Sequence, residues 1–264
     1  PAAEIDAAID QAIATAAASG EEVSEIKIVV PDVAGATTVA VPISVTKLEA
    51  AAGSPQETLT LGMTAVGTVT MDTAAERDLI AEAGSAETVV LVIELETDKD
   101  GGGLDDIAEI PGLDDIAEIP GLTDQQKDAL ADDESLRAVY DVYLAVNGRE
   151  LKGFETAGTL TIGLHYRLEA DEVPEGVRVV YVHENGTTER MNDTRYDAAK
   201  QLAVFTTNHL SIYAVTCELE SVDDSAKTPE KEVSDLGGGC SAGMAGFALL
   251  AMAAVLTRLY KKEK

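Results

Sequence analysis

The stretch Val139-Tyr-Asp-Val-Tyr-Leu-Ala-Val146, followed directly by Asn147-Gly148, decides the expected fold of this chain. Its run of apolar and aromatic residues is typical of a strand. Asn-Gly is a strong signal for a two-residue hairpin turn, because both positions tolerate positive φ. The stretch therefore predicts the first strand and the turn of a β-hairpin. From Val139 onward the pattern indicates strands only.

Strand patterns continue on the C-terminal side of this hairpin. In residues 158–168, Ile162, Leu164 and Tyr166 occupy alternate positions, and residues 177–182 lead to a second Asn-Gly. Further strands are predicted at residues 187–191, 201–206 and 210–216. Short strands separated by turns predict an antiparallel β-sandwich over residues 137–218.

Helices and strands are mixed on the N-terminal side. Ile5, Ile9 and Ile13 are four residues apart, which places them on one face of a helix over residues 4–18. The clearest strand is Glu87-Thr-Val-Val-Leu-Val-Ile-Glu-Leu95. Other strands are predicted at residues 26–30, 37–41 and 58–71, and other helices at residues 45–52 and from Asp72 or Thr73 to Ala83. This mixture predicts an α+β domain over residues 1–97.

A break in composition separates the two predicted domains. Thr97-Asp-Lys-Asp-Gly-Gly-Gly103 precedes a nine-residue segment, residues 104–112, that is repeated without change at residues 113–121. Two copies are too few and too short for a solenoid, whereas lengthening an exposed loop costs little. We therefore expect an acidic linker over residues 98–136, with a helix over residues 125–136.

Asp98, Asp100 and Glu109 are candidate calcium ligands in this linker. They stand at positions 1, 3 and 12 of a calcium-loop template, with Gly103 at position 6. Position 5, however, is Gly102, which offers no side-chain ligand, and flanking helices are not expected. A solvated acidic loop is the preferred interpretation, and we predict no metal and no cofactor.

The C-terminal residues indicate a membrane tether. Residues 219–236 are polar, acidic and without periodicity, as in a flexible stalk. No charged residue lies between Asp235 and Arg258, and a membrane span needs ~20 apolar residues. Arg258 and three lysines follow, and basic residues beside a span stay in the cytoplasm. We therefore expect one transmembrane helix in residues 237–264, with the preceding chain outside the cytoplasm.

The start of this tail, Gly237-Gly238-Gly239-Cys240-Ser241-Ala242-Gly243, is followed by a short apolar run and a basic end. This order resembles a bacterial C-terminal protein-sorting domain of the Synergist-type CTERM kind. The resemblance implies export, retention in the membrane and processing near the glycines by a dedicated envelope peptidase. Cys240 would then be a processing or lipidation site. The alternative, that Cys240 is simply a small residue at the membrane boundary, stays open.

Composition restricts the partners. The formal charge of −29 opposes binding to nucleic acid or anionic lipid surfaces, because the long-range field repels them. The two cysteines, Cys217 and Cys240, do not form a disulfide framework, and two cysteines with three scattered histidines do not indicate zinc. One hypothesis for the function is a carbohydrate-binding appendage of a longer enzyme. The absence of Trp weakens it, because such a module would be expected to expose aromatic side chains.

Three phrases carry a second resemblance: Val179-Val-Tyr-Val-His-Glu-Asn-Gly186, Tyr196-Asp197 and Phe205-Thr-Thr-Asn-His-Leu-Ser-Ile-Tyr-Ala-Val215. They resemble the β-rich modules of bacterial surface and S-layer-associated proteins. The resemblance implies a non-enzymatic protein of the cell envelope with a structural or adhesive role. Other surface proteins or cell-wall glycans would be its partners.

The last phrase also contains His209-Leu210-Ser211, which resembles the self-cleavage tripeptide of GAIN domains and of some ZU5 domains. The resemblance implies that His209 takes the proton of Ser211, whose oxygen then attacks the Leu210 carbonyl to give an ester that water opens. The chain departs from the GAIN pattern because it lacks the cysteines that brace that hairpin. Self-cleavage between Leu210 and Ser211 is therefore the alternative function, and a non-enzymatic envelope protein is the first expectation.

Overall fold

The structure, a computed structural model, describes residues 2–19, 25–33, 35–54, 57–98, 122–131, 133, 135–151, 153–170 and 172–218. Its helices are α1 (Ala2–Ser19), α2 (Val45–Ala52), α3 (Thr73–Ala83) and α4 (Asp124–Ala131). Its strands are β1 (Glu25–Val29), β2 (Thr38–Ser44), β3 (Thr58–Met63), β4 (Gly67–Asp72), β5 (Thr88–Asp98), β6 (Leu136–Val146), β7 (Arg149–Leu151), β8 (Glu155–His165), β9 (Val177–Val182), β10 (Thr188–Arg190), β11 (Arg195–Asp197), β12 (Leu202–His209) and β13 (Ile212–Cys217).

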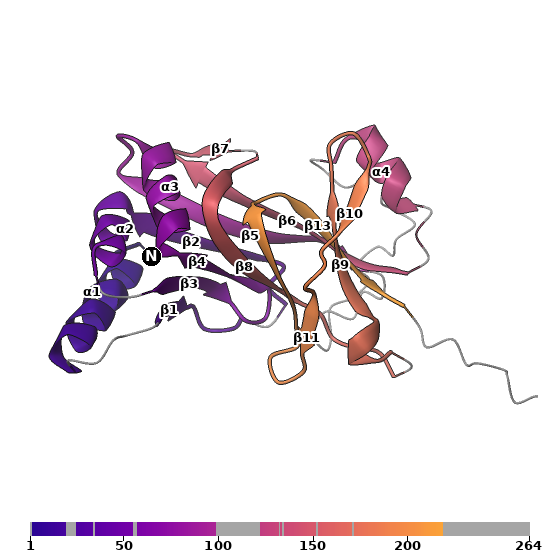
Figure 1. The fold of residues 1–264 in the computed structure, drawn as a ribbon, viewed down its shortest axis with the longest axis horizontal. Coiled ribbons are helices and arrows are strands. Elements are labelled where there is room, and N and C mark those ends of the chain that lie inside the picture. Colours follow the sequence, from indigo (N-terminus) through magenta and orange to yellow (C-terminus); the bar gives the residue numbers. More distant parts are fainter. Residues whose placement is uncertain are drawn as a thin grey trace, which may run out of the picture. The chain divides into compact units, whose positions relative to one another are not determined.

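The strands form two sheets (Figure 1). Sheet A has the order β1-β3-β4-β8-β12-β11, and sheet B has the order β10-β9-β13-β6-β5-β2, with β7 paired to β6. In sheet A, β1 pairs with β3 in parallel, and the other described pairs in both sheets are antiparallel. The fold is therefore a mostly antiparallel two-sheet sandwich with a few helices.

Strands from the two segments that were expected to form separate domains, residues 1–97 and residues 137–218, pair with each other. β4 pairs with β8 in sheet A, and β5 pairs with β6 along almost its whole length in sheet B. Residues 1–221 consequently form one compact unit. Local periodicity located most of the strands, but it gave residues 58–71 as one strand where the structure has β3 and β4, and it did not reveal β7 or β11. It also contains no information about which strand pairs with which.

One continuous core joins the two sheets. Along β8, side chains alternate between exposed and buried over most of the strand, as expected when one face of a sheet packs inward. Phe205 of β12 and Tyr213 of β13 pack against each other at 4.8 Å between ring centroids, so the core extends from sheet A to sheet B. α1 buries Ile5 and Ile9 in the same core, with Ile13 partly buried beside it, which confirms the predicted helix face.

Two turn predictions are confirmed in different ways. Asn147 and Gly148 have φ of 52° and 74°, which is the geometry of a tight hairpin turn between β6 and β7. At the β9–β10 hairpin Gly186 has positive φ, and its amide bonds to the His183 carbonyl. The strand predicted to end at residue 41 continues to Ser44, so that Pro42 lies inside β2. Sheet B tolerates it there because β2 is an edge strand.

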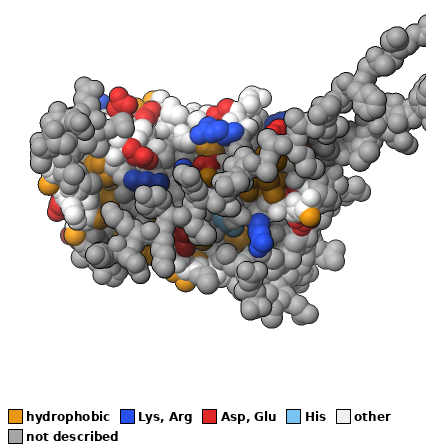
Figure 2. All heavy atoms as spheres, turned by 90° about the horizontal axis from the view of Figure 1, so that it is seen from below, with side chains coloured by type: hydrophobic (Ala, Val, Ile, Leu, Met, Phe, Trp, Pro, Cys, Tyr) orange, Lys and Arg blue, Asp and Glu red, His pale blue; other side chains and the backbone are white. Residues whose placement is uncertain are grey.

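A second, smaller core lies under α4. Leu122 and Leu130 pack there against Val139, Val182 and Ala214 of sheet B. Through this cluster α4 packs on apolar side chains on the outer face of sheet B. Among the described residues, Val33 is the large hydrophobic side chain with high exposure, and Figure 2 shows acidic and basic side chains interspersed with small hydrophobic patches on one face.

Candidate functional site

His209, Leu210 and Ser211 lie where the chain crosses from one sheet to the other. His209 is the last residue of β12 in sheet A, and β13 of sheet B begins directly after Ser211. The crossing is fixed on both sides, because the Leu210 amide donates to the Phe154 carbonyl at 3.0 Å and the Val142 amide donates to the Ser211 carbonyl at 3.0 Å. Leu210 is 3% exposed and fills the core.

His209 is held by aromatic side chains. The Tyr213 hydroxyl donates to the His209 carbonyl at 2.7 Å and lies 2.9 Å from Nδ1. The Tyr181 ring packs on the imidazole with centroids 4.4 Å apart. Burial, opposed by the charges of Glu155 and Glu189, lowers the pKa of His209. Within the described residues no hydrogen bond joins His209 to Ser211, and neither Leu210 nor Ser211 has positive φ.

A pocket of about 400 Å³ lies beside the crossing. Its walls include Asp141 and Tyr143 of β6, Glu150 of β7, His183 at the end of β9, and Ser211. These residues come from four places in the sequence. The sequence prediction included Ser211 but missed Asp141, Tyr143 and Glu150.

The pocket exists because β6 changes its neighbour along one edge. β13 pairs with β6 as far as Ile212 opposite Asp141, and β7 pairs with it from Leu151 opposite Leu144. Between these two pairings the Val142 amide of β6 donates to the Ser211 carbonyl, and no further strand pairing is present among the described residues. The sheet is therefore interrupted at this point, and the interruption leaves space for a pocket.

The start of α4 forms another wall. Thr123 and Gln126 make a reciprocal capping box: the Thr123 amide donates to Gln126 Oε1 and the Gln126 amide donates to Thr123 Oγ1. Gln126 Nε2 also donates to the Val182 carbonyl, and Thr123 Oγ1 donates to the Glu184 carbonyl. At Gly186 a Cβ would lie 2.5 Å from the Gln125 carbonyl oxygen. Glycine there permits α4 to pack closely on the β9–β10 hairpin.

Carboxylates surround the β6 side of the pocket. Glu94 of β5 stands directly opposite Asp141 of β6. Burial raises the pKa of Tyr143, and the charges of Glu94, Asp141, Glu150 and Glu96 raise it further. For Glu96, burial together with the charges of Glu94 and Asp141 raises the pKa to about 7. Several carboxyl groups therefore lie close together in this part of sheet B.

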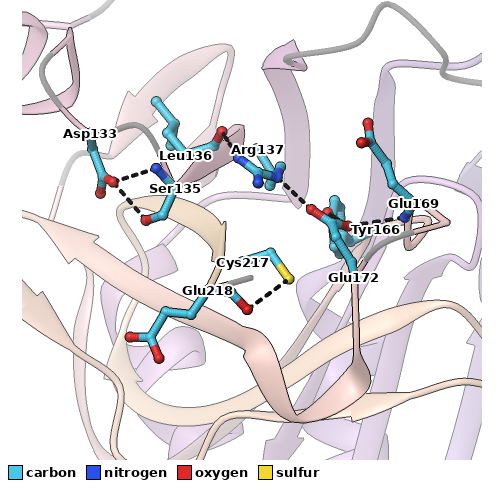
Figure 3. A network of polar contacts seen from close by, with 9 residues as sticks. All are labelled: Asp133, Ser135, Leu136, Arg137, Tyr166, Glu169, Glu172, Cys217 and Glu218. Atoms are coloured by element: carbon cyan, nitrogen blue, oxygen red, sulfur yellow. Dashed lines mark hydrogen bonds and ion pairs between the residues drawn. The ribbon is translucent and has the colours of Figure 1, made fainter. Parts of the chain in front are cut away.

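A buried polar network lies elsewhere in the unit (Figure 3). Arg137 Nε donates to Glu172 Oε1 at 2.5 Å, while Tyr166 and the Glu169 amide donate to Oε2. Burial by itself would raise the pKa of Glu172, but these three donors hold that pKa below its usual range. Burial and the charge of Glu172 raise the pKa of the neighbouring Cys217 thiol to about 11. The network is a satisfied structural cluster, and Cys217 is a poor nucleophile.

The other candidate residues are not placed. Gly237, Gly238, Gly239 and Cys240 lie outside the described residues. Asp98 ends β5, and its partners in the calcium template, Asp100 and Glu109, also lie outside them. Among the residues that the structure describes, no cluster of His, Cys, Asp and Glu has metal-binding geometry.

In the described part of the chain, no helix has the length and apolar character that a membrane crossing requires. No model of a known protein family matches the chain. A comparison with curated proteins likewise finds no match to it.

Proposed function

We propose that this protein is an exported bacterial cell-envelope protein, held in the membrane by a helix in residues 237–264, with a structural or adhesive role. The observation that carries the proposal is the charge pattern of the tail. An uncharged run extends from Leu236 to Thr257, and basic residues follow it. That order is typical of a span whose basic end stays in the cytoplasm.

The central position of β13, the last strand of the folded unit, supports a role in which the protein bears mechanical force. The tail follows β13, and β13 is hydrogen-bonded to β6 on one side and to β9 on the other. A pull on the tether would therefore act on a strand with neighbours on both sides. An edge strand would have only one set of ladder hydrogen bonds to resist it. The Cys217 amide adds a bond to the Ser135 carbonyl at 2.9 Å, close to the point where the pull is applied.

Self-cleavage between Leu210 and Ser211 is the second candidate. The tripeptide occupies a crossing between sheets, where Ser211 lines a pocket. Against cleavage, Nδ1 of His209 pairs with Tyr213, and the Leu210 amide bonds to Phe154. The proposed mechanism requires the imidazole to take the Ser211 proton, so these contacts favour the non-enzymatic role.

The tether is tested by expressing the full chain behind an export signal in a bacterium. We expect it in the membrane fraction, with the folded unit accessible to protease added outside the inner membrane. A matched variant that carries Leu249→Arg and Leu250→Arg within the uncharged run should move to the soluble fraction. A wild-type chain that is fully soluble, or a variant that stays in the membrane, would contradict the proposal.

A further inference from the structure

We propose that the pocket beside β6 binds a carbohydrate that carries no acidic groups. This inference rests on the proposed adhesive role and names the ligand class of that role. The pocket volume of about 400 Å³ lies in the range of small-molecule sites. Its walls are strands, a hairpin and a helix start that is held by the Thr123–Gln126 capping bonds.

The pocket offers hydrogen-bonding groups that the fold does not use. Within the described residues, the Tyr143 hydroxyl, the Ser211 hydroxyl and the Asn185 amide nitrogen make no hydrogen bond, and all three residues line the pocket. By contrast, Asn185 Oδ1 is engaged, because it accepts from the Thr187 amide and hydroxyl. Hydroxyl and amide groups can donate to and accept from sugar hydroxyls. A ligand rich in hydroxyls would satisfy this set best.

Ring faces complete the site. Tyr143 is partly exposed on the outer face of β6. The rings of Tyr181 and His183 also line the pocket, with centroids 4.0 Å apart. Ligand sites combine such flat apolar surfaces with a few placed polar groups, and the apolar C–H face of a sugar ring has the shape to pack on them.

The charge of the lining excludes acidic ligands. Asp141, Glu150 and Glu184 contribute carboxylates to the described lining, which contains no Lys or Arg. Carboxylates repel phosphates, sulfates and uronic acids, whereas they accept strong hydrogen bonds from hydroxyl and amino groups. The carboxylate of Glu94, which stands opposite Asp141, strengthens this selection. Neutral sugars and amino sugars are therefore the compatible carbohydrates.

The test uses the full chain in mild detergent with four probes. They are a trisaccharide of N-acetylglucosamine, its deacetylated amine, a trisaccharide of galacturonic acid, and trilysine. Saturation-transfer NMR and titration measure contact and affinity. We expect the neutral trisaccharide, the amino trisaccharide or both to bind, and the acidic one not to bind. Failure of both sugars to bind, or binding of trilysine alone, overturns the proposal; the second result would assign the pocket to cationic peptides.

Two variants place any binding in the pocket. Tyr143→Ala should weaken sugar binding about tenfold, because it removes both the ring face and the hydroxyl. Ser211→Ala removes one hydroxyl and should weaken binding about threefold, and it remains informative if Tyr143→Ala does not fold. Lys27→Ala, an exposed position on edge strand β1 of sheet A, should bind like the wild type. Unchanged binding in both pocket variants would overturn the proposal. Membrane partition is measured separately, so failure of the sugar site is distinguishable from failure of the tether.

Discussion

Arg137 and Glu172 form an ion pair inside the folded unit: Nε lies 2.5 Å from Oε1, and the two side chains are 7% and 0% exposed. Arg137 belongs to β6 and Glu172 to the segment between β8 and β9 (Figure 3). Tyr166 and the Glu169 amide occupy the second carboxylate oxygen. The pair thus joins sheet B to the loop that leaves sheet A.

Removing one partner of this pair should be costly. Arg137→Ala leaves the Glu172 carboxylate buried without its cation, and we expect a loss of about 3–5 kcal/mol in the free energy of unfolding. Urea denaturation followed by circular dichroism measures it. The matched control is Lys200→Ala, which breaks an exposed ion pair with Asp197 and should cost less than ~1 kcal/mol. Equal losses in the two variants would show that the buried pair does not stabilise the unit.

The free energy of unfolding should depend on pH through the protonation of Glu96. Its folded pKa of about 7 lies above the ordinary value of 4.5, so the folded state holds a proton that the unfolded state releases. The contribution of protonated Glu96 to the free energy of unfolding is therefore fully present below pH 4.5 and is lost as pH rises toward 7. Glu96→Gln should remove this loss and stabilise the protein at pH 8 by about 1 kcal/mol, a value reduced because the carboxyl is only half-buried.

The comparison is made by thermal denaturation at pH 5 and pH 8. Glu57→Gln alters an exposed carboxylate away from the Glu94–Asp141 cluster and should change stability little at either pH. If Glu96→Gln destabilises the protein at pH 8, burial of the Glu96 carboxylate and its repulsion by Glu94 and Asp141 do not control this pH dependence.

The N-cap of α3 should matter more than that of α2. Asp72 Oδ1 accepts the Ala75 amide and Oδ2 accepts the Thr159 amide, both at 2.8 Å, so one side chain caps the helix and ties it to β8. Asp72→Ala should cost about 1–2 kcal/mol. Ser44, the N-cap of α2, makes no side-chain capping bond, and Ser44→Ala should cost less. Chemical denaturation of both variants measures the two losses in the free energy of unfolding. A larger loss in Ser44→Ala than in Asp72→Ala would contradict the capping role of Asp72.

The intact mass of the denatured full chain tests self-cleavage. We expect one full-length species, because His209 contacts Tyr213 and Tyr181 and does not bond to Ser211 within the described residues. Two fragments separated between Leu210 and Ser211, and absent in Ser211→Ala, would replace the non-enzymatic proposal by a self-processing one. Tyr213→Phe provides a second probe, since it frees Nδ1 of His209 while the ring remains.

The pocket was harder to predict than the strands, for a physical reason. Asp141 and Tyr143 occupy alternate positions in β6, between the buried residues Tyr140, Val142 and Leu144, which shows that they share the outer face of the strand. That signal was present in the sequence. The interruption of β6 between β7 and β13 was not, because it depends on where two distant segments end along the same edge.

By itself the sequence determined much of the local structure: most strand periods, the helix face of Ile5 and Ile9, the Asn147-Gly148 turn and a helix start at Asp72 or Thr73, of which the structure shows Asp72 as the cap. Each depends on interactions between residues close in the chain. Only the tertiary structure decided that β4 pairs with β8 and β5 with β6, which merges two expected domains into one sandwich. It also turned His209 toward Tyr213 and placed Tyr143 and Ser211 in the lining of one pocket. Pairing and side-chain environment depend on packing between distant segments, which no local pattern specifies.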